Sequence, residues 1–284
     1  MDIRALGKFL VLVVFSLALA SCTKVKFSYG FLDNWLRWQT YDYFDLNREQ
    51  KSVLKQLTKD FHSWHRHNEL EDYADFLSAT QTTLNQPTID DEDIELTLNQ
   101  VQSLWLRSAE QLHTIAEELL PTLSAEQTEQ IIGNVQQQLM EFQDEQVALQ
   151  PQERVEQLTE RMQKQVKKQV GGLTEQQQNL IKTWAAQQHD TSVYALHQQL
   201  LWLDDLRQIL QSDLSAPANL ARAKKLIFEQ PDYINPQHAE LAQGNNRRTG
   251  ELITALHATL SDKQKHKLIS RLARYERDFR DLAR

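Results

Sequence analysis

The sequence predicts an all-α protein, an antiparallel array of about eight or nine helices that follows a cleaved signal peptide. The chain has only seven Gly and six Pro among its 284 residues, which is well below the usual share of these helix breakers. Gln, Leu, Glu, Ala, Arg and Lys are abundant, and all six are good helix formers. Apolar residues recur at three- and four-residue steps, with no convincing stretch of the alternation that is typical of a strand.

Three apolar stripes support this fold class, and prolines and glycines divide the chain between them. The stripes are Leu98, Val101, Trp105, Ser108, Leu112, Ile115 and Leu119; Val193, Leu196, Leu200 and Leu203; and Leu268, Leu272, Tyr275, Phe279 and Leu282. Each predicts an amphipathic helix with the stripe toward the core. The expected breaks are Pro87, Pro121, Pro151, Gly171–Gly172, Pro217, Pro231, Pro236 and Gly244.

The first 21 residues read as a lipoprotein signal peptide. Arg4 and Lys8 precede an apolar run from Phe9 to Ala20, which is shorter than the about 20 residues that a membrane-spanning helix needs. Leu19-Ala20-Ser21-Cys22 resembles the bacterial lipobox. The resemblance implies that Cys22 receives a diacylglycerol thioether, that cleavage precedes it and that its new amine is acylated, as palmitate labelling would report. The alternative is an ordinary signal peptide that leaves a free thiol.

Lipidation would place the chain in the bacterial cell envelope. Several acyl chains, each contributing about 0.8 kcal/mol per buried methylene, hold a protein firmly on a membrane. Thr23, and not Asp, follows Cys22; in bacteria with two membranes this implies an outer membrane lipoprotein that faces the periplasm. We therefore expect the membrane as a partner, through lipidated Cys22.

Charge argues against nucleic acid as a partner. The whole chain has a net charge of −8. Residues 1–21 carry Arg4, Lys8 and Asp2, a net +1, so the remaining chain is more acidic still. Nucleic-acid binding favours a basic footprint. Basic residues do outnumber acidic ones in residues 262–284, where they suit a helix C-terminus or, alternatively, anionic lipid headgroups.

A short motif, L-[NST]-x-x-Q, occurs four times. It begins at Leu46, Leu123, Leu173 and Leu260. Its Asn, Ser or Thr and its Gln match a capping box, in which the two side chains bond each other's backbone amides at a helix start. The expected core residues further along are Leu54, Ile131, Ile181 and Leu268. The motif also resembles, more weakly, the L-T-x-x-Q repeat of periplasmic helical stress proteins. Acidic residues 90–95 predict a further helix start.

An aromatic segment lies between the anchor and the first motif, and a histidine-rich segment follows. We divide the chain into the signal peptide (1–21), a lipid-anchored aromatic segment (22–46) and a helical domain (47–284). The candidate partner-binding residues of the two segments are Trp35, Trp38, Tyr43, Trp64, His65, Arg66, Glu69 and Tyr73. Aromatic residues there either fill a core seam or form an exposed groove that grips peptide, glycan or lipid.

These segments resemble a family of bacterial envelope lipoproteins without an assigned activity. The resemblance is carried by the lipobox, by Tyr41-Asp42-Tyr43-Phe44-Asp45-Leu46 and by Trp64-His65-Arg66-His67-Asn68-Glu69-Leu70. The chain departs from the family pattern at Glu71, where proline is expected, and by one inserted residue at Asp33-Asn34-Trp35. The resemblance implies a location and a helical fold.

The histidine-rich segment predicts a corner between two helices. The stripe that ends at Trp64 and the stripe that starts at Leu70 are out of phase, and Asn68 with Glu71 could form a capping box. On one unbroken helix His62, His65 and Glu69 could bind zinc. The slip in phase removes Glu69 from that face, so we expect no metal, and polar contacts by His65 and Arg66 instead.

No catalytic, nucleotide or cofactor signature is present in the sequence. We expect no catalytic residue and no cofactor. The expected function is a non-catalytic binding, scaffold or chaperone-like role in the envelope. The alternative is an envelope hydrolase that acts on cell wall or lipid, which a pocket with converging carboxylates would favour.

Overall fold

The computed structural model describes residues 24–229 and 235–284, so the signal peptide, Cys22, Thr23 and Pro231 lie outside the described residues. The described chain is all-α, as predicted, with no strand. It has twelve α-helices: α2 (Lys24–Tyr29), α3 (Leu32–Tyr41), α4 (Arg48–Asn68), α5 (Leu70–Asn85), α6 (Asp91–Leu119), α7 (Ala125–Phe142), α8 (Pro151–Val170), α9 (Glu175–Gln187), α10 (Ser192–Leu210), α11 (Pro217–Lys224), α12 (Pro236–Ala258) and α13 (Asp262–Ala283).

This number exceeds the predicted eight or nine because short helices were not anticipated. The aromatic segment itself forms α2 and α3, and α11 is a separate helix of two turns. Three short segments of tighter or wider helix, Leu120–Thr122, Gln143–Val147 and Lys225–Glu229, extend the ends of α6, α7 and α11.

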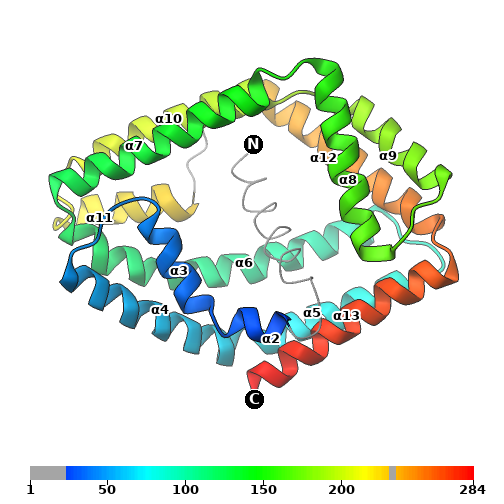
Figure 1. Ribbon diagram of the computed structural model, residues 1–284, viewed down its shortest axis with the longest axis horizontal. Coiled ribbons are helices and arrows are strands. Elements are labelled where there is room, and N and C mark those ends of the chain that lie inside the picture. The colour runs from blue at the N-terminus through cyan, green and yellow to red at the C-terminus, as the bar shows by residue number, and fades with distance from the viewer. Residues whose placement is uncertain (1–23, 230–234) are drawn as a thin grey trace.

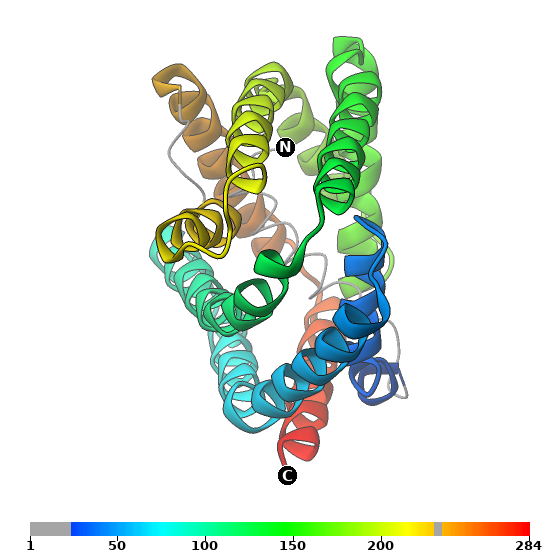
Figure 2. The ribbon, with the colours of Figure 1, turned by 90° about the vertical axis from the view of Figure 1, so that its left-hand side faces the viewer.

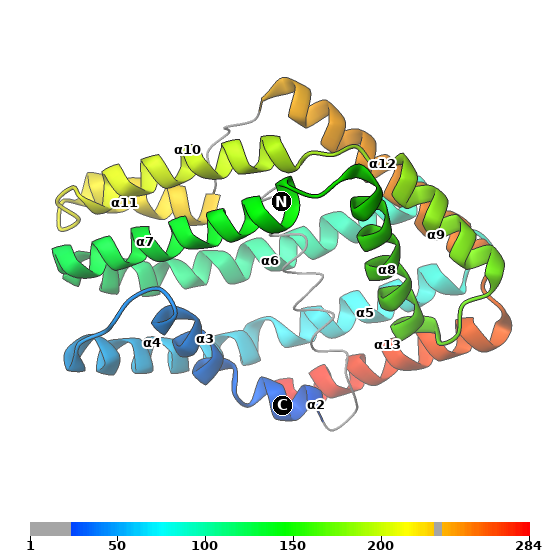
Figure 3. The same ribbon diagram turned by 45° about the horizontal axis from the view of Figure 1, so that its top comes forward.

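The helices form an elongated frame with α6 running across its middle (Figure 1). The α7–α10 pair lies at one side and α13 at the other, as the end-on view also shows (Figure 2). Figure 3 shows α5 alongside α13 and α7 alongside α10, two pairs whose members lie far apart in the sequence. The chain therefore brings distant segments together as helix pairs.

Neighbouring helices run antiparallel, as the contacts between their ends demonstrate. Arg280 binds Glu71 and Asp75 near the start of α5, and Lys265 donates to the carbonyl of Gln86 just past its end. On the α9–α12 pair, Trp184 Nε1 donates to Thr249 and the backbone N–H of His189 to Asn245. The antiparallel arrangement predicted from sequence is thus present in these pairs.

The core is divided into four clusters. One joins α7, α10 and α11, a second joins α2, α5 and α13, a third joins α8, α9 and α12, and the fourth lies where the start of α4 meets the end of α6. Leu272 and Tyr275 are buried in the second cluster, as the C-terminal stripe predicted. A single helix therefore depends on its partner helices for burial, and not on a central core.

All four L-[NST]-x-x-Q motifs are capping boxes, as predicted. Asn47, Ser124, Thr174 and Ser261 are the N-caps of α4, α7, α9 and α13, and each accepts from the backbone N–H of the motif glutamine. Of the expected core residues, Leu54 and Ile181 are fully buried, whereas Ile131 and Leu268 are partly buried. Asp90 and Asp93 form the box that starts α6.

The motif glutamines also pair with each other, which the sequence did not indicate. Gln50 and Gln127 exchange two side-chain hydrogen bonds of 3.0 and 2.7 Å, and Gln177 and Gln264 exchange two of 3.1 and 2.9 Å. Each pair is buried and joins the starts of two helices that lie 77 or 87 residues apart. Each glutamine therefore caps its own helix and fixes a second one beside it.

Three local predictions are wrong. Asn68 does not cap α5; its side chain donates to the Trp64 carbonyl, because α4 continues through Asn68 and Glu69 takes the junction. Gly244 does not end a helix but lies inside α12, where an added Cβ would approach Arg248 to 3.2 Å. Three positions of the predicted apolar stripes do not face the core: Leu98 of α6 is exposed, and so are Val193 and Leu200, because α10 turns a different face inward.

Candidate functional site: the aromatic segment and the histidine corner

Helices α2 and α3 place unlike side chains on opposite faces. Val25, Tyr29, Asp33 and Arg37 recur at every fourth residue, which is the spacing of one helix face, and this face turns toward the rest of the protein. In α2 this face buries Val25 in the second core cluster, whereas in α3 it carries the charged Asp33 and Arg37. Amphipathic helices normally bury their apolar face, so α3 reverses the usual arrangement.

The outward side of these helices is aromatic and exposed, and at the end of α3 it extends to Tyr41, which follows Arg37 by four residues and is the least exposed of the set. We call it the aromatic stripe: Phe27, Phe31, Trp35, Trp38 and Tyr41, whose exposed fractions are 66, 46, 42, 61 and 38%. The rings of Phe27 and Phe31 contact each other, with centroids 4.9 Å apart. Five exposed aromatic side chains within 15 residues are more exposed apolar surface than folding requires, and such surface marks an interaction site.

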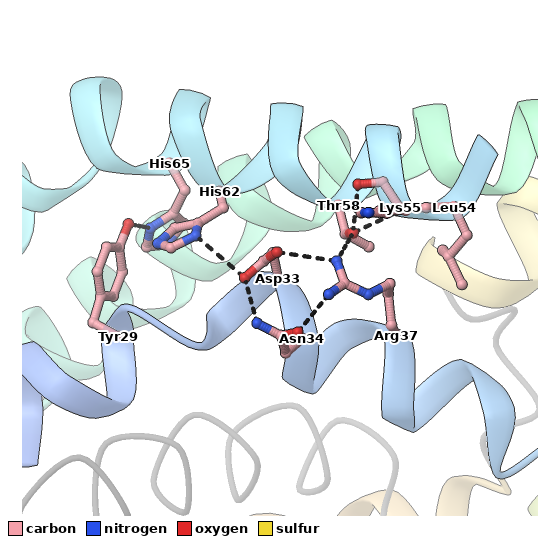
Figure 4. A network of polar contacts seen from close by, with 9 residues as sticks. All are labelled: Tyr29, Asp33, Asn34, Arg37, Leu54, Lys55, Thr58, His62 and His65. Carbon is pink, nitrogen blue, oxygen red and sulfur yellow. Dashed lines mark hydrogen bonds and ion pairs between the residues drawn. The ribbon is translucent and has the colours of Figure 1, made fainter. Parts of the chain in front are cut away.

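A polar network attaches the inner face of α3 to α4 (Figure 4). Arg37 Nη1 donates to Asp33 Oδ2 at 3.0 Å and to Thr58 Oγ1 at 3.3 Å, and its Nη2 donates to Asn34. Thr58, which is fully buried in α4, in turn donates to the Leu54 carbonyl. Because charged partners in a buried site need each other, this network fixes which side of α3 faces the protein.

A second chain of hydrogen bonds crosses four helices at the corner. Tyr29 of α2 bonds His65 Nδ1 at 3.0 Å, and His65 Nε2 bonds the Tyr73 hydroxyl of α5 at 3.1 Å. The Tyr73 hydroxyl also bonds Ser108 of α6 at 3.1 Å. The predicted polar contacts of His65 are therefore confirmed. The predicted corner is confirmed as well, because α4 ends at Asn68 and α5 starts at Leu70.

Burial keeps the linked side chains Tyr29, His65 and Tyr73 uncharged near neutral pH. It lowers the pKa of His65 to about 4 and raises the pKa of Tyr73 to about 12. It also raises the pKa of Tyr29. A neutral imidazole has one donor and one acceptor nitrogen, so one tyrosine accepts from His65 and the other donates to it. These hydrogen-bonded side chains connect α2, α4, α5 and α6.

Two carboxylates, Asp33 and Glu69, lie near these hydrogen-bonded side chains. Burial tends to raise the pKa of Asp33, but the hydrogen bond and charge of Arg37 outweigh it and hold that pKa below its ordinary value. For Glu69 the balance is reversed: burial raises its pKa, and Arg107 offsets this only in part. Arg107 binds Glu69 at 3.1 Å and also binds Asp72. Both carboxylates thus have fixed cationic partners.

The histidines of the corner have separate partners. His62 Nδ1 lies 3.9 Å from Asp33, and burial lowers the His62 pKa. Glu69 is held by Arg107 and not by a histidine. Within residues 24–229 and 235–284, no three His, Cys, Asp or Glu side chains converge as ligands for a metal ion.

The predicted binding residues divide into two groups. Trp35 and Trp38 are exposed, whereas His65 and Glu69 are buried and cannot touch a partner directly. Tyr43 packs on the α7–α10 cluster, and Trp64 and Tyr73 are half-buried. Arg66 lies over the Tyr29 ring at 5.9 Å, so its contact is with an aromatic face. Sequence reasoning missed Arg37 and Thr58, which attach α3 to α4, and Arg107, which pairs with Glu69 at the corner.

A separate groove lies between α9 and α12. It has a volume of about 600 Å³, and its lining includes Trp184, Arg248 and Glu251. The groove lies on other helices than the corner, whose residues belong to α2, α4, α5 and α6. None of the helices in the described ranges is both long and apolar enough to cross a membrane.

Comparison with known proteins gives one match. A model described as a family of unknown function, DUF6279, matches residues 42–234, well over half of the chain. The matched range includes the corner at Trp64-His65-Arg66, whereas the aromatic stripe lies before it. No curated protein and no solved structure matches.

Proposed function

Because the chain belongs to this family of unknown function, as its resemblance predicted, we propose its role from its own features. We propose a lipoprotein anchored through Cys22 in the outer membrane, facing the periplasm. It acts without catalysis, by binding, as a scaffold, assembly factor or chaperone-like protein. The binding surface is the aromatic stripe.

The observation that carries this proposal is the reversed orientation of α3. Five aromatic side chains remain exposed while Asp33 and Arg37 are turned inward and paired. Aromatic residues dominate the energetics of interaction surfaces. A polar network that holds aromatic side chains outward is typical of a surface that binds a partner.

The hydrolase alternative has less support. A hydrolase needs titratable groups that reach a substrate. At the corner, His65 is buried between two tyrosines and Glu69 is paired with Arg107. These groups serve to connect helices, which favours binding over hydrolysis.

The anchor is tested by Cys22→Ala in cells fed with labelled palmitate. The variant should accumulate as an unprocessed precursor without label, because both lipidation and cleavage depend on the thiol. Normal maturation together with undiminished labelling of the variant would contradict lipidation at this residue.

Sorting is tested separately by Thr23→Asp. The parent should fractionate with outer membranes in a density gradient, and the variant should shift toward inner membranes. An unchanged position of the variant would remove the argument for the outer membrane and leave the anchor itself in place.

Binding by the stripe is tested with a photo-crosslinking amino acid in place of Gln39, which is exposed on α3, four residues after Trp35 and next to Trp38. The matched control places the same amino acid at Gln56, exposed on α4. In intact cells Gln39 should give crosslinked adducts and Gln56 should not. Equal yields at both positions would contradict a binding role for the stripe.

A further inference from the structure

We propose that the partner of the aromatic stripe is the lipid bilayer itself: α2 and α3 lie along the membrane surface with the stripe inserted at headgroup depth. The inference rests on the proposed function in one respect, namely that Cys22 carries the acyl chains. It adds that the membrane is a contact surface which orients the protein, and not only a point of attachment.

The position of the stripe in the chain favours the bilayer over other occupants. Helix α2 begins at Lys24, two residues after Cys22, and the first aromatic residue of the stripe is Phe27. A helix rises about 1.5 Å per residue, so residues 27–41 extend over only about 20 Å. A lipid on Cys22 thus keeps the whole stripe within reach of the membrane surface.

The side-chain chemistry of the stripe also fits the interface. Trp and Tyr gather where hydrocarbon meets headgroups, because their rings are apolar and their N–H or O–H remains hydrated. An interfacial helix turns its apolar face into the bilayer and its polar face away. Here the polar face, through Asp33 and Arg37, contacts the protein's own α4 instead of water.

The charges near the stripe indicate how it binds. Lys26 is paired with Asp281 at 2.6 Å, and Arg37 is paired with Asp33 at 3.0 Å. Asp42 is exposed just beyond Tyr41. Over residues 24–46 the three basic residues, Lys24, Lys26 and Arg37, are matched by three acidic ones, Asp33, Asp42 and Asp45, so the segment offers no surplus of positive charge to anionic headgroups. We expect insertion of the aromatic rings to drive the contact, so that neutral phosphatidylcholine suffices and added salt has little effect.

The test measures tryptophan quenching in vesicles. The lipidated protein purified from membranes is reconstituted into phosphatidylcholine vesicles with brominated acyl chains, which quench only tryptophans at or within the bilayer. The fluorescence of the parent should fall. The variant Trp35→Phe/Trp38→Phe should lose most of that quenching, although its phenylalanine rings still reach the membrane. The matched control Trp184→Phe/Trp202→Phe, in α9 and α10, should keep the quenching in full.

A second arm separates this inference from lipidation in the cell. Cys22 is the only cysteine in the chain, so a chain that begins there can be coupled through its thiol to a maleimide lipid in the same vesicles. Quenching of Trp35 and Trp38 in this arm supports docking even if palmitate labelling fails.

Two results would overturn the inference. The first is a protein that is labelled with palmitate and floats with vesicles but shows no quenching at Trp35 and Trp38, which would leave the lipid anchor intact. The second is quenching that is absent in both arms together with concentration-dependent dimerisation that Trp35→Ser/Trp38→Ser abolishes. That result would assign the stripe to a second copy of the chain.

Discussion

Helices α3 and α13 show opposite uses of an amphipathic sequence. In α13, Leu272 and Tyr275 are buried against α5, and Arg280 reaches outward to Glu71 and Asp75. In α3, Asp33 and Arg37 face the protein, and Trp35 and Trp38 face solvent. The first helix obeys the rule that apolar faces are buried, and the second reverses it.

The difference separates folding from function. The apolar residues of a buried stripe are accounted for by the free energy of their burial. A stripe that is exposed, while its helix is held by buried polar contacts, is not explained by folding and points to a partner. The same physical rule therefore identifies α13 as structure and α3 as a surface.

The largest expected effect comes from the α13 side of this comparison. Leu272→Ala removes a buried side chain and leaves a cavity, so the free energy of unfolding should fall by about 3 kcal/mol. Urea unfolding followed by circular dichroism measures it. The control Leu106→Ala, at an exposed position of α6, should change stability by less than about 0.5 kcal/mol. Equal losses in both variants would mean that α13 is not packed as described.

The second effect concerns the polar side of the comparison and depends on pH. The His65 pKa is about 4 in the folded protein and about 6.5 in an unfolded chain. Between these values the unfolded chain binds a proton that the folded protein does not. The contribution of His65 to stability is therefore fully present above pH 6.5 and is lost as pH decreases toward 4, with a slope of up to about 1.4 kcal/mol per pH unit.

This slope is measured by urea unfolding at several pH values between 6.5 and 5, a window that avoids the titration of most carboxylates. His65→Gln should reduce it and leave the contribution of His62, whose pKa burial also lowers, whereas the control His67→Gln, at an exposed position, should leave it unchanged. If His65→Gln keeps the full slope, His65 is not the buried neutral group at the corner.

The sequence anticipated some of these contacts and not others. The all-α fold, the four caps and the polar contacts of His65 follow from signals within a few residues, such as Asn47 with Gln50. The pairing of Gln50 with Gln127 joins residues 77 apart, and no local pattern encodes it. The inward face of α10 was misassigned because the helix carries apolar residues on all its faces: Val193 and Leu200 are exposed and Leu203 is buried.

The candidate site shows the same limit. The stripe and the corner were recognisable as aromatic and histidine-rich sequence, but both the core and the exposed interpretation stayed open. The decision depends on Arg37, Thr58 and Arg107, which become partners of the corner and the aromatic segment only after folding. Single polar or charged residues such as these carry no signal in a sequence that is rich in polar and charged residues.

The third effect is smaller and concerns the helix starts. Ser124→Ala and Ser261→Ala each remove a side chain that accepts from a backbone N–H, with a distance of 3.2 or 3.3 Å. Each should lower the midpoint of thermal unfolding, by the equivalent of about 1 kcal/mol. The control Ser103→Ala, exposed within α6, should not lower it. Melting curves of the cap variants that match the parent would contradict their role as caps.

The smallest expected effect tests the reversed orientation of α3 most directly. Trp35→Ser/Trp38→Ser removes two large aromatic side chains, yet both are exposed, so the free energy of unfolding of the purified mature chain should change by less than about 1 kcal/mol in all. Urea unfolding followed by circular dichroism measures it beside Leu272→Ala. A loss of about 3 kcal/mol or more, comparable with a core deletion, would show that these tryptophans belong to the core and would contradict their assignment to a binding surface.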